Sequence, residues 1–139
     1  MNLFLYKMEE IVTLTQRKRS QIHQSVDIPF YLTIEGYEYN KELGTFLYKI
    51  EYGKQVSQSQ ILRKNIYKRY SEILNFYNEL SMISELIDIN DFLEKFWFFK
   101  NNENKIKRRC ERMSVCLSRV CCIENITKND VFKKFVDEK

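Results

Sequence analysis

Glycine and proline, the residues that most often mark turns, are confined to one stretch of the chain. The single proline and the three glycines lie between residues 29 and 53, at Pro29, Gly36, Gly44 and Gly53. Residues 54–139 contain neither. Turn-rich strands followed by long, uninterrupted helices produce this distribution. We therefore expect a sheet in the first part of the chain and a helical region after it.

The pattern of apolar side chains predicts three strands. Residues 30–35 and 46–52 alternate between apolar and more polar positions, and residues 61–70 form a third segment rich in β-branched and aromatic side chains. Strands that alternate in this way and follow one another through short links are typical of an antiparallel meander.

Three helices are predicted to follow. Apolar residues recur at helical spacing over 73–87, and Ser71 suits the N-cap of this helix. A second helix is expected over about Asn102–Cys122. A third is expected to begin at Thr127, because Thr127 and Asp130 together resemble a capping box. The predicted fold class is therefore α+β, a three-stranded antiparallel β-meander packed against a helical subdomain of about three helices.

Length and composition fit one globular domain. The 139 residues are 44% hydrophobic and 30% charged, which is typical of a folded chain. No apolar run approaches the roughly 20 residues of a membrane span, and the N-terminus lacks the pattern of a signal peptide, so we expect a cytoplasmic protein. We divide the chain into an N-terminal extension of residues 1–27 and a domain of residues 28–139. The extension is either loosely attached or a helix that docks on the domain or on a protein partner.

The residues needed for catalysis or metal binding are scarce. The one histidine, His23, lies in a polar stretch, and no glycine-rich phosphate loop is present. The four cysteines lie in the second predicted helix, without a Cys-x-x-Cys pair. We therefore predict no enzyme activity, no metal site and no cofactor, and thiols that pack as small apolar side chains.

Positive charge is concentrated near the start of the second predicted helix. The chain has a net charge of +4, and residues 95–112 carry seven Lys or Arg residues against two Glu residues. Such a surface attracts phosphate groups on lipid or nucleic acid. On a helical wheel, Arg109 falls within the apolar face, where a guanidinium needs an anionic or acceptor partner. That partner is either an acidic side chain of another element or an anionic ligand in a pocket between helix and sheet.

A complementary cationic site is predicted where the third strand meets the first helix. Lys68 and Arg69 lie close to the positive end of the helix dipole, a natural place for a phosphate. The neighbouring Tyr70 offers a flat face against which a ring can lie.

This stretch also carries a family resemblance. Residues 66–73 (IYKRYSEI) resemble the R-R-Y-[ST]-x-F motif of phox-homology (PX) domains, with Lys68 in place of the first Arg and Ile73 in place of the Phe. These domains are phosphoinositide-binding modules with a three-stranded meander packed on helices. The resemblance extends over about residues 28–139. It does not include the family's P-x-x-P run, since residues 88–100 contain no proline.

The resemblance implies a site for phosphatidylinositol 3-phosphate. In it, Arg69 grips the 3-phosphate and Tyr70 packs beneath the inositol ring. Arg109, in an R-x-x-x-[apolar] pattern, contacts the 4- and 5-hydroxyls. Lys95 contacts the 1-phosphate, with Lys100 as the rival candidate.

The function implied is that of a membrane-targeting module, peripheral on endosomal or vesicular membranes and partnered by phosphoinositide-containing membrane. One alternative is a protein-interaction domain with a degenerate lipid pocket, which the missing proline run would fit. Nucleic acid is not an expected partner, since aromatic residues are not interleaved with the helical cations.

Four consecutive aromatic residues, 96–99, lie between the two candidate lysines. They cannot all face one core in a helix or a strand. Either some pack inward and the others lie against the N-terminal extension, or they reach the membrane interface, where Trp rings partition and lysines meet anionic lipid. In the second case, the candidates for membrane insertion are Phe96, Trp97 and Phe98.

Overall fold

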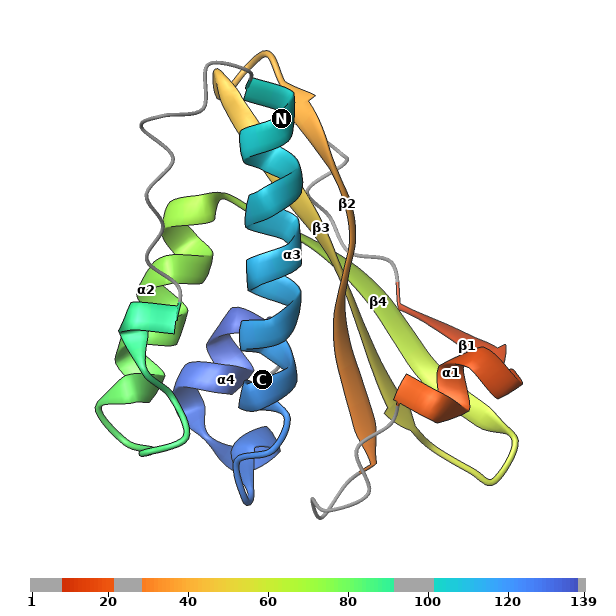
Figure 1. The fold of residues 1–139 in the computed structure, drawn as a ribbon. Coiled ribbons are helices and arrows are strands. Elements are labelled where there is room, and N and C mark those ends of the chain that lie inside the picture. The colour runs from red at the N-terminus through yellow and green to blue at the C-terminus, as the bar shows by residue number, and fades with distance from the viewer. Residues whose placement is uncertain (1–8, 22–28, 92–101, 138–139) are drawn as a thin grey trace.

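An antiparallel sheet forms one layer of the molecule, and α2, α3 and α4 cover one of its faces (Figure 1). The computed structural model describes residues 9–21, 29–91 and 102–137. In chain order, the elements of these residues are β1 (Glu10–Thr13), α1 (Gln16–Gln21), β2 (Phe30–Asn40), β3 (Thr45–Gln55), β4 (Gln60–Lys68), α2 (Tyr70–Ser81), the 3-10 helix η2 (Ile89–Asp91), α3 (Asn102–Val120), the 3-10 helix η3 (Ile126–Lys128) and α4 (Asp130–Phe135).

The predicted α+β class is confirmed, with one strand more than expected. Strands β2, β3 and β4 form the predicted meander, and the sheet of the described residues has the order β1-β4-β3-β2. The additional strand, β1, pairs antiparallel with β4 and places Val12 opposite Ile61. It comes from the segment we treated as an extension. Four residues are too few for an alternating pattern to predict a strand. The division into an extension of residues 1–27 and a domain of residues 28–139 stays a prediction.

The main core lies between the sheet and the three helices. Strands β2, β3 and β4 bury alternate side chains there, including Phe30, Ile50 and Ile66. Phe132 of α4 packs edge-to-face on Phe30, with the ring centroids 5.6 Å apart. Two cysteines of the α3 region, Cys116 and Cys121, are buried in the same core. Burial raises the pKa of Cys121 to about 12, so that this thiol stays protonated at neutral pH.

A second, smaller core lies on the opposite face of the sheet, under the N-terminal segment. Leu14, Tyr31 and Ile61 are buried together there. The Tyr31 ring lies directly over Gly53. A Cβ atom added at Gly53 would be only 2.2 Å from a carbon of this ring. The Tyr31 hydroxyl donates a hydrogen bond to the buried carboxylate of Glu51. This packing explains why a strand residue at the centre of the sheet is a glycine.

Ion pairs fasten the N-terminal segment to β4. Arg63 pairs with Glu10 of β1. The buried amine of Lys64 lies 3.4 Å from Glu9 and 3.2 Å from the carbonyl oxygen of Asp137, near the other end of the chain. Residues 9–21 are therefore packed on the sheet through both apolar and charged contacts.

The predicted start of the last helix is wrong by two residues. Asn129, rather than Thr127, caps α4, because its side-chain oxygen accepts from the backbone N–H groups of Val131 and Phe132 at 2.8 and 3.3 Å. Thr127 lies in η3 instead, with its side chain buried. Asn and Thr are both good caps, so the local sequence alone did not decide between them.

The Tyr31–Gly53 contact predicts that Gly53→Ala destabilises the protein. The added methyl must displace a fully buried ring, a type of overpacking that costs about 1–3 kcal/mol. Urea denaturation of Gly53→Ala should show this loss in the free energy of unfolding. In a Tyr31→Ala background, the same substitution should cost nothing or stabilise, since alanine restricts the unfolded chain more than glycine does. Equal losses in both backgrounds would show that the ring is not the cause.

Candidate functional site

The junction between β4 and α2 places an arginine at the N-terminus of a helix. Arg69 has an extended backbone and occupies the N-cap position of α2. Its backbone N–H donates to Glu72 Oε1 at 3.0 Å. The prediction that Ser71 caps this helix is therefore wrong, because the Glu72 carboxylate reaches back to Arg69 and starts the helix at Tyr70. Arg69 itself is exposed at the N-terminus of α2, where the helix dipole supplies partial positive charge.

Arg109 of α3 lies on the ring of Tyr70, the first residue of α2. The guanidinium carbon is 4.0 Å from the ring centroid. Both side chains are half-buried, and Tyr70 packs against the main core. A guanidinium stacked on an aromatic face is held by its charge and by its planar shape. The structure thus brings together two residues that the sequence analysis selected independently, one from a motif and one from a helical wheel.

Arg69, Tyr70 and Arg109 form one cluster at the N-terminus of α2. It offers two guanidinium groups and an aromatic ring. Guanidinium groups bind phosphate oxygens through paired hydrogen bonds, and the helix terminus adds partial positive charge. This combination suits an anionic ligand that also carries a ring.

Lys68, the preceding basic residue, contacts a different helix. Its Nζ atom lies 5.2 Å from the centroid of the Phe135 ring on α4. It lies two residues after Ile66 on β4, and alternate strand residues share a face, so it points toward the helices. There it borders an open hollow of about 290 Å³ lined by Lys68, Glu72, Asn75, Phe76, Glu79, Val131, Lys134 and Phe135.

The remaining predicted site residues are not placed by the structure. Lys95, its rival Lys100, and the aromatic residues Phe96, Trp97 and Phe98 lie outside the described residues. Their roles stay predictions.

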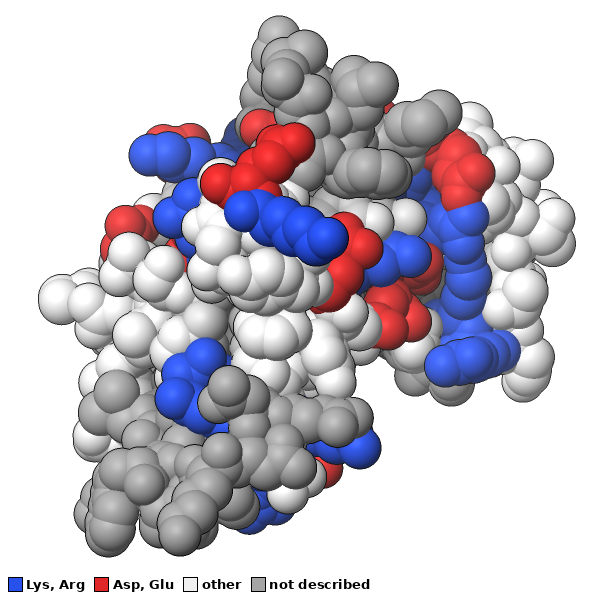
Figure 2. Space-filling model, turned by 90° about the horizontal axis from the view of Figure 1, so that it is seen from above, with Lys and Arg blue, Asp and Glu red and all other residues white. Residues whose placement is uncertain are grey.

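The described surface does not carry charge of a single sign. Figure 2, which views the molecule from above, shows basic and acidic side chains next to one another. On α3, for example, Arg108 and Glu111 approach to 3.3 Å. Selective binding of an anion here depends on a few placed side chains more than on a general positive field.

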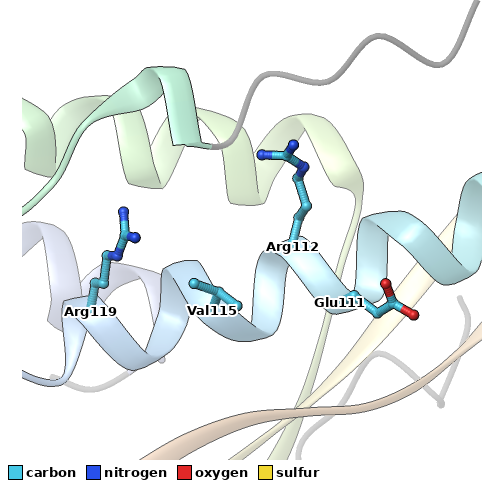
Figure 3. Close-up of a pocket in the computed structure, with 4 residues that line it drawn as sticks. All are labelled: Glu111, Arg112, Val115 and Arg119. Carbon is cyan, nitrogen blue, oxygen red and sulfur yellow. The ribbon is translucent and has the colours of Figure 1, made fainter.

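The sequence analysis missed a second open hollow, on α3. It measures about 250 Å³ and is lined by Glu111, Arg112, Val115 and Arg119 (Figure 3). The sequence does show that residues 112, 115 and 119 share one side of the helix, because they are three and four positions apart.

Comparison with known proteins decides the family. A scan against protein-family models matches the PX domain over residues 56–139, more than half of the chain. The chain belongs to the PX domain family. The match spans α2 and α3, and thus Arg69, Tyr70 and Arg109. A search of curated proteins found no match.

A solved structure supports the PX fold over a longer stretch. The mouse SNX19 PX domain, crystallised with a bound sulphate ion, is similar with a TM-score of 0.54 and 20% sequence identity. The similarity covers 81% of this chain and 99% of the mouse domain.

Family membership makes the chain a phosphoinositide-binding, membrane-targeting module. PX domains associate with the membrane surface and are generally not enzymes. Among the helices of the described residues, none has the length and apolar character needed to cross a bilayer.

If Arg109 serves a ligand, its removal should cost little stability. Methionine fits the apolar face of α3, and the lost Tyr70 contact contributes at most about 2 kcal/mol, so Arg109→Met should change the melting temperature of the lipid-free protein only slightly. If Arg109 instead neutralises a buried acidic group, the variant leaves that group unpaired, and the melting temperature falls clearly. Arg108→Met is the matched control, because its exposed pair with Glu111 contributes at most about 1 kcal/mol. Thermal denaturation of the three proteins decides between the two roles.

Proposed function

We propose that this PX domain binds phosphatidylinositol 3-phosphate at the cluster of Arg69, Tyr70 and Arg109, and that this lipid recruits it to endosome-like membranes. The observation that carries the proposal is the contact of Arg109 with the Tyr70 ring, directly after Arg69. A motif residue and the arginine of the long helix meet there, as a headgroup site requires.

Each residue has a distinct part in the proposed complex. Arg69 holds the 3-phosphate by bidentate hydrogen bonds, helped by the N-terminus of α2. A phosphomonoester carries about −1.5 to −2 charges near neutral pH, which two or three cations can balance. Tyr70 supports the inositol ring, and Arg109 donates to the 4- and 5-hydroxyls. Lys95, or its rival Lys100, is proposed for the 1-phosphate.

The stacked position of Arg109 has a consequence for binding. The guanidinium lies on the Tyr70 face, where the inositol ring is also proposed to pack. Both groups cannot cover the same area, so we expect Arg109 to shift toward the ring edge when the headgroup enters. It then exchanges a contact of about 0.5–2 kcal/mol for hydrogen bonds to the ligand hydroxyls.

The bound sulphate of the mouse SNX19 PX domain is consistent with the proposal, since sulphate has the tetrahedral shape and charge of a phosphate group.

The alternative function is protein interaction through a domain with a degenerate lipid pocket. One observation favours the alternative. Lys68, the first basic residue of the motif, contacts Phe135 of α4 and so is already engaged within the protein.

Substitution of Arg69 tests the proposed phosphate contact. Arg69→Ala should lower affinity for phosphatidylinositol 3-phosphate vesicles at least tenfold, and Arg69→Lys should also bind poorly, because a point charge cannot replace the guanidinium fork. Arg108→Ala removes the same charge from an exposed position on α3 and should bind like the wild type.

Vesicle sedimentation over a panel of phosphoinositides measures both affinity and preference. Unchanged sedimentation of a folded Arg69→Ala protein contradicts the proposed site. Equal binding of the wild-type protein to all phosphoinositides of the panel would contradict the proposed lipid.

Trp97 reports on the proposed membrane insertion, since it is the only tryptophan of the chain. Burial of an aromatic side chain contributes roughly 1.5–3 kcal/mol, and each lysine near an anionic surface about 1 kcal/mol. We expect the Trp97 emission to shift to the blue with vesicles that contain the lipid, and not with the soluble headgroup. The alternative outcome is a lipid-free protein that already shows the short emission wavelength of a buried indole. If that wavelength stays unchanged while vesicles bind, Trp97 lies in the core and the insertion is contradicted.

A further inference from the structure

A patch of exposed apolar side chains lies at the C-terminal end of α2. Met82, which caps this helix, keeps 78% of its surface accessible, and Ile83 and Leu86 keep 56% and 54%. Scattered exposed apolar residues are ordinary on a protein surface, whereas a group of large ones marks an interaction site. We call Met82, Ile83 and Leu86 the apolar patch.

The backbone under the apolar patch is ordered and anchored. The N–H groups of Met82 and Ile83 donate to the carbonyl oxygens of Glu79 and Leu80 at 3.2 and 3.1 Å. Leu80 on one side of the patch and Ile87 on the other are buried in the main core. Side chains on a backbone held in this way lose less conformational freedom on binding than those of a mobile loop.

The surroundings of the apolar patch are acidic. Residues 70–94 contain six Asp or Glu residues and no Lys, Arg or His, in a chain whose net charge is +4. Glu85 and Asp88, next to Leu86 in the sequence, are exposed, and no ion pair of the described residues involves either of them. Glu79 lines a hollow together with Lys134, which offsets its charge. The C-terminus of α2 adds partial negative charge to that of Glu85 and Asp88.

We propose that the apolar patch docks a basic amphipathic helix of a partner protein. A stripe of leucine side chains on the partner covers Met82, Ile83 and Leu86, and Lys or Arg residues beside the stripe pair with Glu85 and Asp88. Exposed ion pairs contribute little each, so the charges select the partner more than they hold it, and we expect weak binding.

The sign of the charge favours a protein over the other possible occupants. Nucleic acid and anionic lipid are both negatively charged, so Glu85 and Asp88 repel them. A basic helix is attracted by the same two side chains.

The position of the apolar patch also disfavours a membrane. α2 has 12 residues, so its C-terminal end lies about 18 Å along the helix axis from Tyr70. In Figure 1, the loop that follows α2 lies at the opposite end of this helix from the junction with β4. The distance exceeds the Debye length of roughly 8–10 Å at physiological salt, so a membrane at the headgroup cluster has little influence on the patch.

A peptide titration without lipid tests this inference independently of phosphoinositide binding. The probe is a synthetic peptide of about 18 residues, long enough for a partly formed helix, with leucines along one side and lysines on both flanks. It is added up to about millimolar concentration to the 15N-labelled full chain. We expect amide shifts centred on residues 79–88.

The apolar and the charged contacts are tested by separate variants. Ile83→Ser/Leu86→Ser should weaken peptide binding at least tenfold. Val56→Ser, at a similarly exposed apolar position with 50% of its surface accessible, should change it less than twofold. Glu85→Lys/Asp88→Asn should also weaken binding at least tenfold, and Asn keeps the side-chain oxygen that accepts from the Asn90 N–H.

The matched charge control is Glu38→Lys/Glu42→Gln, which makes the same change in net charge at exposed positions of the hairpin between β2 and β3. It should weaken peptide binding less than threefold. Equal losses in the two charge variants, shifts centred on Arg69 and Tyr70, or no shifts at millimolar peptide would each overturn the inference.

The same spectra separate the other occupants. Shifts of residues 79–88 that grow with protein concentration alone would assign the apolar patch to a second copy of the chain and overturn the inference. Stronger engagement of these residues by single-stranded RNA or by phosphatidylserine vesicles would overturn it as well. A chain that binds the peptide but not phosphatidylinositol 3-phosphate contradicts the proposed function alone, and the converse contradicts this inference alone.

Discussion

The contact between Arg109 and Tyr70 is the interaction on which the functional account depends. It joins the long helix α3 to the first residue of α2, with a guanidinium 4.0 Å from a half-buried ring. The main core fixes both partners, since Tyr70 packs against it and α3 buries its apolar face there. A charge is thereby kept at a helix N-terminus without full burial, which limits its desolvation cost.

The two faces of the sheet pack against different parts of the chain. The face toward α2, α3 and α4 carries the main core, whose packing positions Tyr70 and the apolar face of α3. The opposite face carries a small core under β1 and α1, where Tyr31 lies over Gly53 and Glu51 is buried among Tyr31, Lys18 and Arg63. The N-terminal segment therefore completes the sheet on the face opposite to α2, α3 and α4.

Much of the fold and the centre of the site could be predicted, because their signals are local. Period-two alternation indicated the meander, and the angle of Arg109 on a helical wheel placed it toward the sheet. The rest depended on contacts between distant segments. Strand β1 is defined by pairing with β4 rather than by its own four residues. The direction of Lys68 follows from the pleat of β4, but its partner Phe135 required the position of α4.

A crystal structure with a short-chain phosphatidylinositol 3-phosphate tests the central claim most directly. The account predicts the 3-phosphate within hydrogen-bonding distance of the Arg69 guanidinium, the inositol ring against Tyr70, and Arg109 displaced from the ring face toward the 4- and 5-hydroxyls. A headgroup bound elsewhere would contradict it, for example in the hollow between Lys68 and Lys134 with Arg109 still stacked on Tyr70.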